Sequence, residues 1–250
     1  MPPSRISRMD CAMTDRSASW SPASEFRLTR LADDIWIARQ PLVFYGFRMT
    51  TCMTVCRLGN GTLWVHSPIA PTPELLAELA PLGSVRHIVA PNRLHHLHAL
   101  DFLAASPGAT LYVAPGLADK NPAFASHPPV PPRAAPWAAD IDSVFIEGNS
   151  ELNETVFFHQ PSRSLVITDL AVHIGPWDSF GTRTYARLNG FYDRFGLSFL
   201  LKRFFRDRDA ARASLQRVLA WDFERIVPAH GPVIAADARS RLESAFAWLR

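Results

Sequence analysis

Apolar positions recur along the chain with two different periods, and their order predicts a layered α/β fold. Runs rich in β-branched and aromatic residues cover 35–47 and 49–58, and a Gly-Asn-Gly turn leads into a third run at 62–68. Apolar strands and amphipathic helical stretches then alternate as helix 73–82, strand 86–91, helix 99–105 and strand 110–115. This alternation is typical of parallel strands joined by crossover helices.

The second half of the chain begins with strands and ends mainly with helices. Apolar runs predict strands at 143–148, 154–160, 164–169 and 225–230. Apolar residues spaced three and four apart predict helices at 189–205, 209–223 and 237–250.

Two segments lack such periodicity. The proline-rich stretch 116–137 predicts a surface loop, and residues 1–27, rich in Ser and Pro, predict a disordered tail. We therefore expect one domain at 28–250, with a helical insertion near 186–223.

Composition narrows the function classes only slightly. The chain has 250 residues and a formal net charge of +3, a surplus that gives no argument for a nucleic-acid partner, and none is expected. No apolar stretch is long enough for a membrane span and no secretory signal is recognisable, so we expect a cytoplasmic protein. The cysteines Cys11, Cys52 and Cys56 form no disulfide framework, and the last two are expected to be buried thiols.

Candidate chemistry lies where apolar strands end. His66 ends one strand, a cluster of three histidines (His95, His96 and His98) follows another, and Asp169 and His230 end two more. Ligand-binding side chains of layered α/β folds gather on the loops outside strand ends, so these residues can meet although they are far apart in sequence. Histidine and aspartate are ligands of zinc, iron and manganese.

The order of these motifs resembles that of the metallo-β-lactamase superfamily over 31–249. In that family a His-rich loop follows a strand, an Asp ends the second strand of a hairpin, and a late His lies in a tight turn. Asp169 matches the Asp and His230 matches the late His. The resemblance implies an α/β fold, a four-layer αββα sandwich of two mixed sheets.

The His-rich loop departs from the family pattern. Its usual H-x-H-x-D-H is replaced by N-x-x-H-H, with Asn92 and Leu94 where the first two histidines are expected. The mid-chain His is also missing, since its position falls near 150–151. The resemblance therefore implies a divergent branch in which a standard dinuclear site is not expected.

Two functions follow from this resemblance. The first is a metal-dependent hydrolase of a small ester, thioester, lactone or phosphoester, with one divalent ion (zinc, or iron or manganese) held by His95, His96, Asp169 and His230. Asp169 would also be catalytic, and Asn92 would contact the substrate. The second is a non-enzymatic binding or structural module with the same fold and no metal.

Other polar residues are expected to have structural roles. Glu151 and Glu154 could supply an oxygen ligand, but a solvated turn is favoured for both; His159 and His173 are expected to be structural histidines. The Phe- and Arg-rich segment 191–208 is expected to pack on the core as an amphipathic helix. The alternatives are contact with a membrane interface or an anionic substrate, a lid, or contact with a second copy of the chain.

Overall fold

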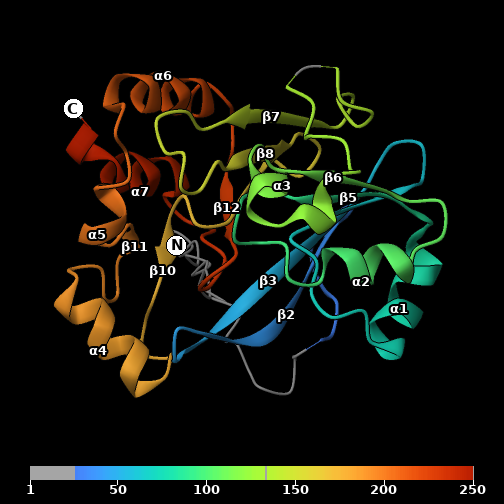
Figure 1. Ribbon diagram of the computed structural model, residues 1–250, viewed down its shortest axis with the longest axis horizontal. Helices are drawn as coiled ribbons and strands as arrows, with labels where there is room; N and C mark the ends of the chain where they lie inside the picture. Colours follow the sequence, from blue (N-terminus) through green and yellow to red (C-terminus); the bar gives the residue numbers. More distant parts are fainter. Residues whose placement is uncertain (1–25, 133, 250) are drawn as a thin grey trace, which may run out of the picture.

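Two mixed β-sheets face each other and carry helices on their outer sides (Figure 1). The computed structural model describes residues 26–132 and 134–249, so nearly all of the predicted tail lies outside the described residues. The larger sheet follows the chain order: β1 (Thr29–Ala32), β2 (Ile35–Phe44), β3 (Phe47–Arg57), β4 (Leu63–His66), β5 (Val85–Ala90) and β6 (Thr110–Val113). The smaller sheet has the order β12 (Arg225–Pro228), β9 (Ser164–Ile167), β8 (Thr155–His159) and β7 (Ile141–Phe145).

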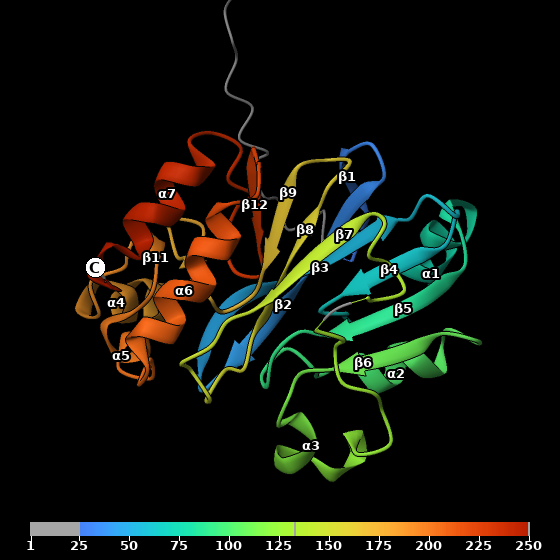
Figure 2. The ribbon, with the colours of Figure 1, turned by 90° about the horizontal axis from the view of Figure 1, so that it is seen from above.

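Helices complete the four layers. Figure 2 shows α1 (Pro73–Leu79) and α2 (Ala99–Ala104) outside the larger sheet, and α6 (Arg208–Leu219) and α7 (Ala238–Ala245) outside the smaller one. The remaining short elements are α3 (Leu117–Lys120), α4 (Phe180–Leu188), α5 (Phe199–Lys202), the strand pair β10 (Val172–His173) and β11 (Phe195–Gly196), and the 3₁₀ turns η2 (Ala80–Leu82), η3 (Pro122–Phe124) and η4 (Ala247–Leu249).

Local sequence explains where the outer helices begin. Thr72 caps α1, because its side chain accepts a hydrogen bond from the Leu75 N–H, and Pro73 occupies the first turn, where its missing N–H costs nothing. Asp207 caps α6 in the same way through the Ala210 N–H. Each helix then turns an apolar face toward its sheet, and burial of that face is the main stabilising contribution.

Three apolar cores separate the four layers, as expected for the predicted αββα sandwich. One lies between the larger sheet and α1 and α2, and includes Leu75 and Phe102. The second joins the two sheets through residues such as Trp64 and Phe157. The third lies between the smaller sheet and α6 and α7. The predicted fold class is therefore confirmed.

Strand direction brings the predicted site residues to one edge of the sandwich. In the larger sheet β4, β5 and β6 are parallel, and in the smaller sheet β9 and β12 are parallel. The loops that leave β4, β5, β9 and β12 therefore emerge where ligands gather in such folds.

One predicted helix is absent. The segment expected to be helical at 189–205 contains only β11 and α5. Gly190 and Asp193 have φ values of 73° and 53°, outside the right-handed helical region, so α4 ends before them and no helix continues through the segment. The buried thiols of Cys52 and Cys56 agree with expectation. Among the described residues, no helix combines the length and apolar character needed to cross a membrane.

Candidate metal centre

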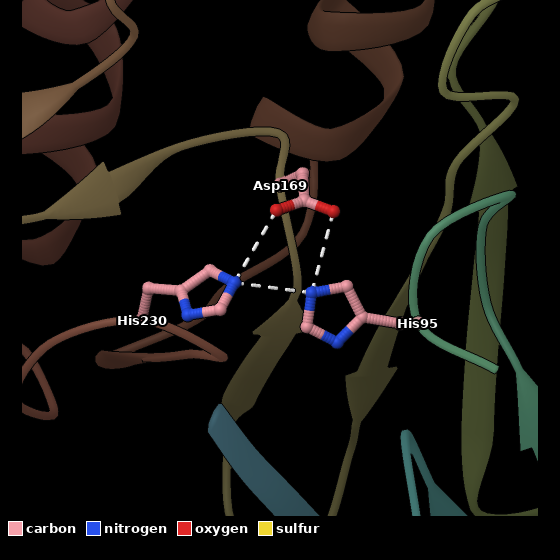
Figure 3. A group of neighbouring side chains, drawn as sticks. All are labelled: His95, Asp169 and His230. Carbon is pink, nitrogen blue, oxygen red and sulfur yellow. Dashed lines mark hydrogen bonds and ion pairs between the residues drawn. The ribbon is translucent and has the colours of Figure 1, made fainter. Parts of the chain in front are cut away.

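His95, Asp169 and His230 meet at the edge where the parallel strands end (Figure 3). The His95 Nε2 atom lies 3.2 Å from His230 Nε2 and 3.3 Å from Asp169 Oδ2, and His230 Nε2 lies 3.4 Å from Asp169 Oδ1. All three side chains are nearly enclosed, with side-chain exposures of 7%, 12% and 7% in chain order. Two imidazoles and one carboxylate therefore converge on a single point.

The second nitrogen of each imidazole is held by the protein. His230 Nδ1 lies 2.7 Å from the Thr50 carbonyl oxygen, and because a carbonyl only accepts, Nδ1 is the donor. In the neutral ring this leaves a lone pair on Nε2, facing the other two residues. His95 Nδ1 pairs at 2.7 Å with the Ser67 hydroxyl. Such partners fix the tautomer and orientation of metal-binding histidines.

Asn92 connects the loop that carries His95 to the loop that carries Asp169. Its carbonyl oxygen accepts the backbone N–H groups of Leu94 and His95 at 2.8 and 2.7 Å. Its amide nitrogen lies 2.8 Å from Asp169 Oδ2 and 3.1 Å from Glu154 Oε2. The Asn92 side chain thus orients two of the three converging residues.

Glu154 holds the loop that carries Asp169. Its carboxylate accepts the backbone N–H groups of Thr168 at 2.7 Å and Asp169 at 2.8 Å, and the residue is only 2% exposed. The solvated turn favoured from sequence is therefore wrong for Glu154. The expectation failed because its burial depends on strands distant in the chain.

Burial and close contacts shift the ionisation of the site. Burial alone would raise the pKa of Asp169, but the neighbouring His95 and His230 lower it well below its usual range. Burial opposes protonation of His230, yet its contacts with Asp169 raise its pKa. Burial and the charge of Asp169 raise the pKa of Glu154 to about 7. Asp169 is therefore the carboxylate that these contacts keep ionised.

The donor set fits a divalent metal ion. Two histidines and one carboxylate form a known set of ligands for catalytic zinc and for non-haem iron. Ligands bonded at about 2.0–2.1 Å to a tetrahedral ion are roughly 3.3 Å apart, close to the 3.2–3.4 Å separations here. His95, Asp169 and His230 could hold such an ion.

A pocket of about 620 Å³ opens over these three residues. Its walls come mainly from the β2–β3 hairpin, the loop after β5, and the segment from β10 to α5. A cavity of this size is in the usual range for small-molecule sites.

Two other predicted site residues lie elsewhere. His96 is outside the converging group, and its ring packs edge-on against Phe124 at a centroid distance of 5.2 Å. Asn92 was expected to contact the substrate. In the structure it is fully buried and absent from the pocket wall, and its side chain connects two loops instead.

Two other strand-end histidines pack against tryptophans. His66 stacks on Trp64 in the core between the sheets, where burial, with the charge of His95 adding to it, lowers its pKa to about 3. His173 packs against Trp177. Ser67 was missed as a site residue; the signal in the sequence was a small polar residue directly after a buried strand.

The fold has many counterparts among solved structures. A metallo-β-lactamase from Pontibacter korlensis is similar with a TM-score of 0.58 and 14% identity, covering 88% of this chain and 98% of the other. The metallo-β-lactamase FIM-1 from Pseudomonas aeruginosa, in a mono-zinc form, is similar with a TM-score of 0.58 and 12% identity, covering 89% and 93%. The metal-soaked flavodiiron core of Flv1 from Synechocystis sp. PCC6803 has a TM-score of 0.59 and 11% identity, covering 89% and 60%.

These similarities show the fold, which is that of the metallo-β-lactamases. No curated protein sequence matches the chain. One family model does, over residues 32–179, which is more than half of the chain. The chain therefore belongs to the family described as Domain of unknown function (DUF4336).

Proposed function

We propose that the protein is a metal-dependent hydrolase of a small-molecule substrate, with one divalent ion held by His95, Asp169 and His230. The observation that carries the proposal is the convergence of two imidazole nitrogens and one carboxylate within 4.8 Å of one another, at the edge of a substrate-sized pocket. A divalent ion bound there would supply Lewis-acid polarisation of the substrate and activation of water near neutral pH.

The chain's own residues would prepare the site for that chemistry. Asp169 is kept ionised by its histidine neighbours and can accept a hydrogen bond from water, which orients the water toward the substrate. Ser67 and the Thr50 carbonyl hold the two imidazoles, and Asn92 holds the carboxylate. The three side chains are only 7–12% exposed, which limits their contact with bulk water.

Structural relatives support a metal but leave its identity open. One is described in a mono-zinc form and another as a flavodiiron core. A two-histidine, one-carboxylate set suits both kinds of ion, so zinc, iron and manganese are all candidates.

The proposal is tested by elemental analysis of untagged protein purified without chelator. We expect about one zinc, iron or manganese ion per chain, and its loss in His95→Ala, Asp169→Asn and His230→Ala. His96→Ala is the matched control, because His96 neighbours His95 in sequence but lies outside the converging group, and it should keep the ion.

Two results would contradict the proposal. Metal-free wild-type protein that takes up no ion on incubation would favour the non-enzymatic alternative. Loss of the ion in His96→Ala, with retention in His95→Ala, would place the site elsewhere in the loop.

A further inference from the structure

The pocket above the candidate metal centre is apolar over most of its wall. Leu42 and Met49 are cross-strand partners in the β2–β3 hairpin and both line it. Val172, Ile174 and Phe191 line it from the segment after Asp169. The buried polar residues His95, Asp169 and His230 line the same pocket. A ligand that fills this space must therefore present a polar group to the centre and an apolar group to the walls.

The charged side chains of the pocket wall distinguish phosphoesters from neutral esters, thioesters and lactones, the substrate classes that the sequence leaves open. Within the described part of the chain no arginine lines the pocket, and Lys120 is its single lysine. The Lys120 ammonium already donates to the Arg93 carbonyl oxygen at 2.7 Å. Sites for phosphorylated compounds use arginine and lysine side chains or helix N-termini to bind the phosphate. Two helix starts reach the pocket, but each is capped by its own serine: Ser179 accepts the Thr182 N–H, and Ser198 accepts the Leu201 N–H. The pocket wall therefore favours a neutral acyl compound over a phosphoester.

The outer end of the pocket is apolar as well. Phe44, Tyr45 and Leu97 line it and are 40%, 88% and 61% exposed. Large exposed apolar side chains gathered at one opening indicate a binding surface. An acyl chain that extends past the pocket would remain in contact with them.

From these observations we propose that the pocket binds the chain of a medium- or long-chain acyl ester or thioester, with the carbonyl group at His95, Asp169 and His230. This proposal rests on the proposed hydrolase function for its chemistry. Water would supply the hydroxyl group of the released carboxylic acid, the carbon–oxygen or carbon–sulfur bond would break, and the released alcohol or thiol would take the remaining proton.

Binding of dodecanoate to the full-length protein, measured by calorimetry, tests the pocket independently of hydrolysis. Each buried methylene adds a favourable increment, so dodecanoate should bind at least about a hundredfold more tightly than butyrate. The same titration with phosphatidylcholine vesicles shows whether the pocket takes the acyl chain of a lipid in a bilayer or that of a soluble compound. Binding in either form supports the proposal, and binding in neither overturns it.

Two neighbouring positions on β2 provide a matched pair of variants. Leu42 lines the pocket, whereas Val43 is 65% exposed and, because side chains alternate along a strand, points to the opposite face. Leu42→Asp should weaken dodecanoate binding at least tenfold, and Val43→Asp should leave it unchanged. Both positions lie at the partly exposed end of the hairpin, so both variants should fold. If the two variants bind dodecanoate with equal affinity, the acyl chain does not lie in the pocket.

Hydrolysis of p-nitrophenyl acetate and p-nitrophenyl dodecanoate separates the two proposals. A kcat/KM for p-nitrophenyl dodecanoate that is at least about tenfold higher than for p-nitrophenyl acetate supports the acyl pocket. Dodecanoate binding with no hydrolysis of either ester would refute the hydrolase and keep the pocket. Hydrolysis without any preference for chain length would refute the pocket and keep the hydrolase.

Discussion

At the scale of single residues, the candidate centre depends on groups that orient its three members. Ser67 is the least expected of these. It directly follows β4, is 3% exposed, and has a φ of 51°, a conformation that residues other than glycine adopt at a cost. This conformation accompanies a hydroxyl placed 2.7 Å from His95 Nδ1. The strained backbone and the hydrogen bond together indicate that Ser67 fixes the His95 ring.

Removing the Ser67 hydroxyl should therefore weaken the metal site without unfolding the protein. Loss of a partner that orients a metal-binding histidine typically costs 10- to 100-fold in metal affinity, so we expect the zinc Kd of Ser67→Ala to rise by about that factor. Competition with a chromophoric chelator measures the constant. Ser106→Ala is the control, because its buried hydroxyl has no hydrogen-bond partner among the described residues and lies outside the pocket. Equal constants for both variants and wild type would exclude the orienting role.

Single residues also show how much of the site could be predicted from the sequence. The convergence of Asp169 and His230 was predictable, because each ends an apolar run and strand direction within a sheet places such ends together. The choice between His95 and His96 was not, since adjacent loop residues differ only in where the backbone points them. The burial of Glu154 and of Asn92 was not predictable, because it depends on hydrogen bonds between segments 62 residues apart.

At the scale of elements, the tight turn after β12 determines where His230 lies. Gly231 has a φ of 102°, and a Cβ atom there would lie 2.2 Å from the His173 carbonyl oxygen. The same close approach allows the His173 N–H to donate to the His230 carbonyl oxygen at 3.0 Å. Only glycine satisfies both the backbone conformation and the space.

Gly231→Ala should consequently displace the turn and impair both stability and metal binding. Gly190→Ala is a matched control, because Gly190 has a similar positive φ of 73° but no atom within 4 Å of the added Cβ. The control should lose about 1 kcal/mol from the left-handed conformation alone, and Gly231→Ala at least about 2 kcal/mol more, with loss of the ion. Urea unfolding and elemental analysis give both quantities. Equal losses of stability would mean that the turn adapts and that the close approach has no consequence.

Most elements followed from local pattern, and the exceptions have a physical cause. The strands β4, β8 and β9 were predicted from short apolar runs, and they are buried at every position. The helices α1, α2, α6 and α7 were predicted from apolar spacing that marks one buried face. The predicted helix at 189–205 failed because its apolar residues serve different surfaces: Phe191 lines the pocket and Phe205 packs in the outer core. The spacing of apolar residues alone cannot distinguish residues that contact different surfaces from residues that share one face of a helix.

At the scale of the whole molecule, the sandwich buries ionisable groups in the layers beside the site. His159, at the end of β8, is fully buried and pairs at 2.7 Å with the Ser162 hydroxyl. Burial lowers its pKa to about 4, from an ordinary 6.5, although Asp140 and Asp34 act in the opposite sense. Between those two values the unfolded chain binds a proton that the folded protein excludes, so stability must fall as the pH falls.

We therefore expect the free energy of unfolding to decrease from pH 6.5 to about pH 4, with His159 responsible for up to about 3 kcal/mol of the loss. In His159→Gln this contribution is absent, so the variant should lose less stability than wild type over that range. Urea denaturation at half-unit pH steps measures both curves. Between pH 7 and 8 the histidine is neutral in both states, and the two curves should run parallel, which provides an internal control. If they remain parallel down to pH 4.5, burial of a neutral His159 is not a source of acid sensitivity in this fold.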